Sequence, residues 1–258
     1  MGNLIRMDLY RMRKGKAFII CLVLAFILAL ISMPLLKLLS SLATMLATDA
    51  EVTPFATDAN LSSILSDPFP GMNAMLTLIS VCAFFYADVE NGYIKNIAGQ
   101  MPKKGFTILS KFICALPHNL LFAVVSIAGS VAGTILVQRL HMDGAVLESI
   151  GAFCLKMLLI QSICAILVLL VSALKLKSLG MVIAVVMGLP LLSLIYALID
   201  SGIQQLFTDA GPIFAKYMPD QLMRVQYPNM LESILVAAGV TCIFLLLAIR
   251  IFDKKDVT

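Results

Sequence analysis

The sequence has little charge: 13% of its 258 residues are Asp, Glu, Lys or Arg, and tryptophan is absent. A soluble globular domain carries about 25% charged and about 45–50% apolar residues, whereas this chain is 60% apolar. This composition excludes an ordinary soluble domain and indicates a membrane protein.

Motifs for chemistry are also missing. The sequence contains no GxxxxGK[ST] phosphate-binding loop, no GxGxxG, no HExxH and no GxSxG, and it has only two histidines, His118 and His141. The six cysteines lie in apolar stretches without CxxC spacing, so we expect neither disulfides nor a metal site. We therefore expect no catalytic residues, no directly bound cofactor and no nucleic-acid partner.

Long apolar runs are what the sequence does contain. Spanning the hydrocarbon takes about 20 apolar residues of helix. Six runs reach or approach that length, at about 17–36, 70–87, 112–137, 150–173, 179–199 and 230–251. We expect an all-α polytopic membrane protein with six transmembrane helices in one domain, residues 1–258. A cleaved signal peptide is the alternative for the first run, which is longer than the usual ~7–15-residue apolar region.

Lys and Arg positions predict the orientation of these spans. With the N-terminus inside the cell, fourteen Lys and Arg residues fall on the cytoplasmic side and four fall outside, while Lys156 falls within a span. Both termini are therefore expected in the cytoplasm.

Two flanking segments show helical spacing of apolar residues. In residues 1–16, Ile5, Leu9 and Met12 share one face, which predicts an interfacial helix; an ordinary basic flank is the alternative. In residues 200–229, two short apolar helices dipping into the outer leaflet are expected, with a structured surface loop as the alternative. The residues that shape this outer re-entrant segment are Gly211, Pro212, Phe214 and Pro219.

Three polar residues at membrane depth are candidates for a transport path. His118 and Asn119 follow Pro117 in the third run, and either a hydrogen-bonded helix kink or a substrate or proton role explains them. Lys156 in the fourth run must find a partner, reach toward the outer headgroups or line a cavity.

Small residues indicate close packing and bending. Ser126, Gly129, Ser130 and Gly133 recur on one face of the third run and allow a neighbouring helix to approach, in the same chain or another. Gly188 and Pro190 predict a kink or flexible point in the fifth run.

Between the second and third runs lies one charged segment, YADVENGYIKNIAGQMPKKGFTILSK, residues 86–111. It resembles the first cytoplasmic loop of ABC-2-type transporter permeases, in which an acid-x-Glu-x-Gly-Thr-x-Lys run is followed by Pro, a basic residue and Lys. Tyr93 replaces the usual Thr, and Lys104 replaces the usual Arg. The matching positions are Asp88, Glu90, Gly92, Lys95, Asn96, Pro102, Lys104 and Lys111.

The resemblance implies a permease subunit in the bacterial plasma membrane that is driven by a separate ABC ATPase. Residues 87–107 would form a coupling helix seated on that ATPase, where Ile94 and Ile97 supply an apolar ridge within a charged rim; an idle linker is the alternative. The expected coupling residues are Glu90, Gly92, Ile94, Lys95, Asn96, Ile97 and Lys104.

The resemblance also implies an assembly of two ATPase copies, which hold ATP-Mg, with a second permease that is identical or homologous. The absence of a large outer domain resembles the branch that exports antimicrobial peptides such as bacitracin or lantibiotics. A membrane sensor or immunity subunit, which binds peptide or lipid through 200–229 without transporting it, is the alternative.

Overall fold

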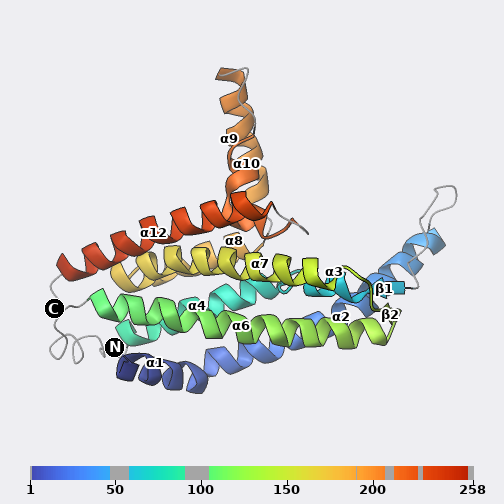
Figure 1. Ribbon diagram of the computed structural model, residues 1–258, viewed down its shortest axis with the longest axis horizontal. Helices are drawn as coiled ribbons and strands as arrows, with labels where there is room; N and C mark the ends of the chain where they lie inside the picture. Colours follow the sequence, from blue (N-terminus) through green and yellow to red (C-terminus); the bar gives the residue numbers. More distant parts are fainter. Residues whose placement is uncertain are drawn as a thin grey trace.

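The computed structural model is almost entirely helical, and it describes residues 2–46, 58–90, 105–189, 191–206, 212–225 and 229–254 (Figure 1). Long helices lie side by side along one axis, and a shorter unit formed around α9 stands across them (Figure 1). The expected all-α class is confirmed, with one small exception at the strands described below.

The chain begins with α1 (Gly2–Lys14), which Gly15 separates from α2 (Lys16–Leu46). With 31 residues, α2 is about 46 Å long at 1.5 Å per residue, which exceeds the ~30 Å of a bilayer core. Its apolar part, residues 16–42, is long enough to span a membrane.

Two short strands connect distant parts of the chain. β1 (Asp58–Asn60) pairs in parallel with β2 (Arg139–His141), so that Asp58 lies opposite Arg139. Between β1 and α4 (Asn73–Glu90) lies α3 (Leu61–Leu65). The apolar part of α4, residues 73–87, is shorter than the other candidate spans, so the structure does not confirm the second expected span.

Three further helices are long and apolar enough to cross a membrane. They are α6 (Gly105–Ile135), α7 (Val146–Leu167) extended by the π-helix η1 (Val168–Ala173), and α12 (Met230–Lys254). Helix α6 begins seven residues before the expected span at 112, so residues 105–107 of the expected coupling segment belong to a long helix.

The fifth expected span is not one straight helix. The chain forms α8 (Lys177–Gly188) and α9 (Leu192–Leu206), which meet at 82°. The bend falls where Gly188 and Pro190 predict a kink, although Pro190 itself lies outside the described residues. Two one-turn helices follow, α10 (Phe214–Tyr217) and α11 (Pro219–Leu222).

The described part of the chain therefore contains four helices able to span a membrane, or five if the bent α8–α9 pair counts as one span. Six spans are not confirmed, because α4 is short and the fifth run is bent. The coarser prediction of a multi-helix membrane protein holds.

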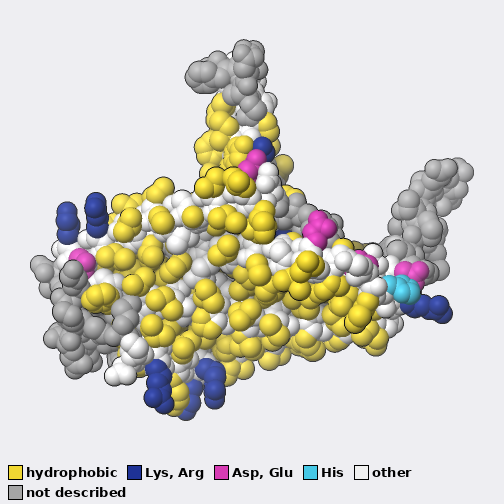
Figure 2. Space-filling view, in the orientation of Figure 1, with side chains coloured by type: hydrophobic (Ala, Val, Ile, Leu, Met, Phe, Trp, Pro, Cys, Tyr) yellow, Lys and Arg dark blue, Asp and Glu magenta, His cyan; other side chains and the backbone are white. Residues whose placement is uncertain are grey.

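The helix bundle has two distinct ends. The N-terminal end is where α1 begins, α4 ends, α6 begins and α12 ends (Figure 1). At the far end lie α3, β1 and β2 (Figure 1). Apolar side chains cover most of the visible bundle between the two ends, and Lys and Arg gather toward the edges (Figure 2).

The small residues of α6 pack against α2 of the same chain. A Cβ on Gly129 would lie 2.8 Å from Ala29 Cβ and from Phe26 O, and a Cβ on Gly133 would run into Leu30 O. The helix that approaches these small residues is therefore α2 of the same chain, a choice that the sequence left open.

Helix α1 docks on α6 through a face that includes a carboxylate. Leu4, Asp8 and Met12 are its buried residues, so the buried stripe is displaced from the expected Ile5, Leu9 and Met12. Ser110 Oγ donates a 2.6 Å hydrogen bond to Asp8 Oδ2, which provides a polar partner for the buried acid.

Candidate functional site

A buried polar cluster joins α4, α6 and α7 in the middle of the bundle. Ser80, His118 and Asn119 are fully or almost fully buried, and Gln161 is 8% exposed. The ring of His118 stacks on Phe122 with centroids 4.6 Å apart and also contacts Phe18 at 5.3 Å. Packing on both sides therefore holds the imidazole in place.

The hydrogen bonds of this cluster form one directed chain. Gln161 Nε2 donates to Phe112 O at 2.7 Å, and Asn119 Nδ2 donates to Gln161 Oε1 at 3.0 Å. Asn119 Oδ1 then accepts from His118 Nδ1 at 3.4 Å, which makes Nε2 the acceptor of the 2.9 Å bond from Ser80. In this series of hydrogen bonds, His118, Asn119 and Gln161 each donate one bond and accept another.

One hydrogen bond of this series lies next to the break that Pro117 makes in the backbone hydrogen bonds of α6. Pro117 lies inside α6 and has no N–H for the carbonyl four residues earlier, at Ile113. The neighbouring carbonyl, Phe112 O, accepts from Gln161 of α7. His118 and Asn119 thus form hydrogen bonds with Ser80 of α4 and Gln161 of α7, and neither bond is to the carbonyl of Ile113 that Pro117 leaves without its helical donor.

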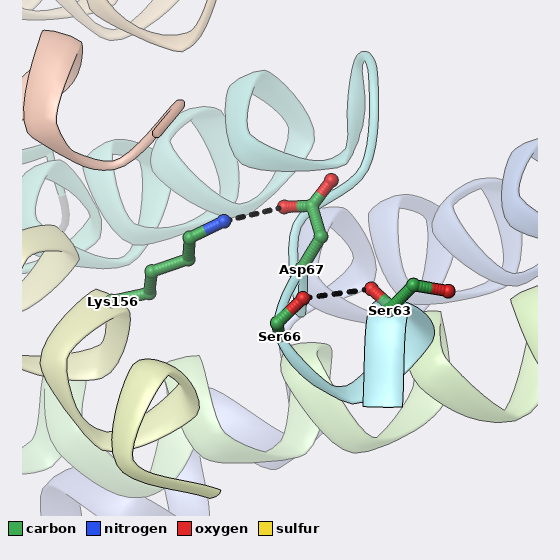
Figure 3. Close-up of polar contacts among 4 residues, drawn as sticks. All are labelled: Ser63, Ser66, Asp67 and Lys156. Carbon is green, nitrogen blue, oxygen red and sulfur yellow. Dashed lines mark hydrogen bonds and ion pairs between the residues drawn. The ribbon is translucent and has the colours of Figure 1, made fainter. Parts of the chain in front are cut away.

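Lys156 is buried and is paired with a half-exposed carboxylate. Its side chain is 1% exposed, and its Nζ lies 3.3 Å from Oδ1 of Asp67, whose side chain is 46% exposed (Figure 3). Asp67 is held in the turn after α3, where Ser66 Oγ donates to Ser63 O at 2.9 Å (Figure 3). Of the three alternatives for Lys156, a partner is observed, and the same residue also lines a cavity.

A polar cavity adjoins this pair toward the far end. It measures about 230 Å³ and is lined by Ser63, Asp67, Lys156 and Arg224. The guanidinium of Arg224 donates to Gly188 O at 3.1 Å and to Met187 O at 3.4 Å. These carbonyls belong to the last turn of α8, where the break in the helix leaves acceptors without helical donors.

The expected path residues therefore fall into two groups. His118 and Asn119 belong to the mid-bundle cluster, and Lys156 belongs to the far-end pair. Gln161 lies five positions after Lys156 in α7, which is about 7.5 Å along the helix axis. The structure does not join them through a continuous series of hydrogen bonds among the described residues.

At the N-terminal end, the helix ends that flank residues 91–104 are held by polar contacts. Lys111 is 1% exposed, and its Nζ donates to Phe85 O of α4 at 2.7 Å. The backbone N–H of Gly105, at the start of α6, donates to Asp253 Oδ1 of α12 at 2.7 Å. A carboxylate at a helix N-terminus also opposes the positive end of the helix dipole.

Of the expected coupling residues, Glu90 is described and the others lie outside the described residues. Glu90 is the last residue of α4, and its Oε2 lies 3.7 Å from Lys177 Nζ of α8. Those outside are Gly92, Ile94, Lys95, Asn96, Ile97 and Lys104.

Within residues 200–229, which are expected to form the outer re-entrant segment, α9 and α10 are held together by a carboxylate. Asp200, 4% exposed, accepts hydrogen bonds from the backbone N–H groups of Ile213 (3.1 Å) and Phe214 (2.9 Å), which pins α10 to α9. Phe214 also stacks on Tyr196 with centroids 6.4 Å apart. Gly211 lies outside the described residues.

The two prolines of this segment have different environments. Pro212 is exposed, whereas Pro219 is buried as the first residue of α11. In α11, burial raises the pKa of the Asp220 carboxyl above its ordinary value, although hydrogen bonds from Gln221 and Tyr196 oppose the shift.

Several residues of these sites were not identified from the sequence. Gln161 has a visible signal, a polar amide inside an apolar run. Asp8 has one as well, because it lies four residues from both Leu4 and Met12. Asp67, Arg224 and Asp253 have no local signal, since their partners are distant in sequence.

No group of three or more His, Cys, Asp or Glu residues in the described ranges could hold a metal ion. Comparison of the chain with protein-family models, curated proteins and solved structures found no match.

Proposed function

We propose that this chain is the membrane-spanning permease subunit of an ATP-driven transporter of the ABC-2 type. The body of apolar helices supports a membrane location, and the absence of a phosphate-binding loop in the sequence is consistent with ATP-Mg bound by a partner. In this proposal two ATPases act on two permeases in a bacterial plasma membrane, with both termini of this chain in the cytoplasm.

The observation that supports the proposal best is that polar contacts connect the helices on either side of residues 91–104 to each other and to α12. Lys111 ties the start of α6 to the end of α4, and Asp253 ties the first residue of α6 to α12. A displacement of the intervening segment would therefore move three helices together. This is the mechanical property that a segment pushed by a partner requires.

Two further contacts extend this linkage. Ser110 bonds to buried Asp8 of α1, and Glu90 pairs with Lys177 at the beginning of α8. The Glu90–Lys177 pair is largely exposed and contributes little to stability. In this proposal the pair matters because it connects the end of α4 to the beginning of α8.

Charge supports the proposed orientation. The following described Lys and Arg residues belong to elements at the N-terminal end: Arg6, Arg11, Arg13, Lys14, Lys16, Lys111, Lys175, Lys177, Arg250 and Lys254. Cytoplasmic ends of membrane proteins carry such an excess. We therefore assign the N-terminal end to the cytoplasm and the far end to the outside.

The cargo in this proposal is hydrophobic or amphipathic, such as an antimicrobial peptide, and is exported. The chain has 15 methionines, whose flexible thioethers suit varied apolar surfaces. The far-end cavity, with Lys156, Arg224 and Asp67, offers a polar contact at the outer side.

The test uses the ridge at Ile94 and Ile97. The tagged chain is purified from its native membrane, and copurified proteins are sequenced for GxxxxGK[ST] and assayed for ATP hydrolysis. Ile94→Asp with Ile97→Asp should abolish both signals. The matched control is Met142→Asp with Leu147→Asp, two residues at the far end that are 86% and 83% exposed, which should retain both. If both double variants copurify the ATPase and its activity equally well, the coupling role is refuted.

A sensor or immunity subunit is the second candidate, and one observation favours it. The α9–α10 unit stands away from the bundle and exposes Leu194 (74%) and Leu198 (72%). This surface could bind an apolar peptide directly. If purified chain binds peptide equally well with and without ATP, and vesicles containing the assembly move none, the sensor reading replaces the transporter.

A further inference from the structure

A cavity of about 490 Å³ lies at the N-terminal end, enclosed by the joint between α1 and α2, the end of α4 and the beginning of α8. We call it the elbow pocket; Lys14, Lys16, Phe18, Ala83, Glu90 and Lys177 are among its lining residues. Its volume falls within the ~300–1,000 Å³ of small-molecule sites. The function proposed above makes no use of it.

The charge of the lining is positive. Among the described lining residues there are four cations, Arg11, Lys14, Lys16 and Lys177, and one carboxylate, that of Glu90. Glu90 already neutralises Lys177, with Oε2 and Nζ 3.7 Å apart. Lys14 is the last residue of α1 and Lys16 is the first residue of α2, with Gly15 alone between the two helices. An anionic occupant is therefore favoured over a neutral or cationic one.

Beneath these cations the lining is apolar and aromatic. Phe18 is 6% exposed, and Phe84, Ala83 and Met181 complete the apolar part of the wall. Ser80, at 2% exposure, connects this wall to the hydrogen-bonded chain of His118. A ligand that fills the pocket must combine an anionic group with an apolar part.

The pocket adjoins the apolar outer surface of α2. Ala17 lines it and is exposed, and Ile19 and Ile20, which follow on the same helix, are 51% and 58% exposed. In a membrane this surface contacts acyl chains, because the helix has spanning length and hydropathy. An acyl chain can thus continue from the pocket along α2.

We propose that the elbow pocket binds an anionic phospholipid, with its phosphate between Lys14 and Lys16 and an acyl chain along the exposed face of α2. Basic pockets between membrane helices on the cytoplasmic side recognise anionic lipid headgroups. The bound lipid would connect the α1–α2 joint to α4 and α8. The proposal needs only a membrane position and is independent of any ATPase partner.

The test compares chains in phosphatidylcholine nanodiscs with and without phosphatidylglycerol. Retained phosphatidylglycerol is counted by native mass spectrometry, and the wild type should also unfold at a higher temperature when this lipid is present. Lys14→Gln with Lys16→Gln should weaken retention roughly ten- to thirtyfold, because each cation near an anionic lipid surface contributes a factor of about three to five.

The matched control is Arg6→Gln with Arg13→Gln, which removes the same charge from exposed positions of α1 outside the pocket. It should retain the lipid as the wild type does. A steric variant, Ala83→Leu, changes no charge and should also lower retention. Equal losses in the two charge variants, or retention unchanged by Lys14→Gln with Lys16→Gln, would overturn the proposal. Displacement of the lipid by glycerol phosphate at equal concentration would do so too, by indicating a soluble anion.

Discussion

The ammonium of Lys156 lies 3.3 Å from Oδ1 of Asp67, a residue 89 positions earlier in the chain. The two ends of this ion pair differ in environment, since the Lys156 side chain is 1% exposed and that of Asp67 is 46% exposed. The interior cation depends on the pair, whereas the carboxylate has water as an alternative partner.

This asymmetry predicts unequal effects of removing either partner. Asp67→Asn should lower the free energy of unfolding by about 1–3 kcal/mol, less than for a fully buried pair because solvent screens Asp67. Lys156→Met should cost less than about 1 kcal/mol, since it replaces a buried cation with an apolar chain of similar length. Denaturant unfolding in detergent micelles measures both.

The control for this pair is Lys216→Met, which removes an exposed partner of Glu232 at 3.6 Å and should have no measurable effect. A larger loss for Lys156→Met than for Asp67→Asn would contradict the prediction, and would point to a second anionic partner for Lys156.

The position of a residue in the hydrogen-bonded chain predicts its effect on stability. Gln161→Leu removes an interior member, so that both Asn119 Nδ2 and Phe112 O lose a partner, and we expect a loss of about 2–4 kcal/mol. Ser80→Ala removes the first member and affects only His118 Nε2, so about 1 kcal/mol is expected. Thermal unfolding in nanodiscs compares them, and equal losses would argue against a directed chain.

Close contact between α6 and α2 predicts that Gly133 tolerates no larger residue. A Cβ there would overlap Leu30 O and lie 3.2 Å from Leu30 Cα, so Gly133→Ala forces the two backbones apart at a cost of about 1–3 kcal/mol. Gly151 on α7 has nothing within 4 Å of a Cβ, so Gly151→Ala should be neutral or stabilise by up to about 1 kcal/mol. A neutral Gly133→Ala, measured in the same unfolding assay, would show that the helices are farther apart.

Burial of Asp220 predicts a pH dependence of stability. Because burial raises its folded-state pKa above the unfolded value, the folded protein holds a proton over that interval while the unfolded chain does not. Its contribution to stability is therefore fully present below the ordinary aspartate pKa and is lost as pH rises through the raised pKa. The melting temperature of the wild type should therefore fall as the pH rises through this interval, and Asp220→Asn should remove that fall. Identical pH profiles for the two proteins would contradict a raised pKa of Asp220.

Helices with a long local signal could be predicted from the sequence. The apolar runs that became α2, α6, α7 with η1, and α12 are each longer than the hydrocarbon core requires, whatever their neighbours. The runs at 70–87 and 179–199 were predicted as spans in the same way, and six spans are not confirmed. One forms the shorter α4, and the other contains Gly188 and Pro190, where the backbone turns by 82°.

The candidate sites were predictable only in part. His118, Asn119 and Lys156 stand out because polar groups at membrane depth need partners. Which partners they take depends on how the helices are rotated and aligned along their axes, and a single helical pattern contains no information on that. Asp67 in a loop and Gln161 on another helix were therefore missed.

The sequence by itself determined that this protein is built from membrane-length helices and carries an excess of cations toward one side, because chain length, hydropathy and charge are properties of short segments. Only the tertiary structure decided that Lys156 meets Asp67, that Asp253 caps the start of α6, and that Lys14 and Lys16 line the elbow pocket together with residues of α4 and α8. These relationships join residues far apart in the chain, and they exist only once the helices pack together.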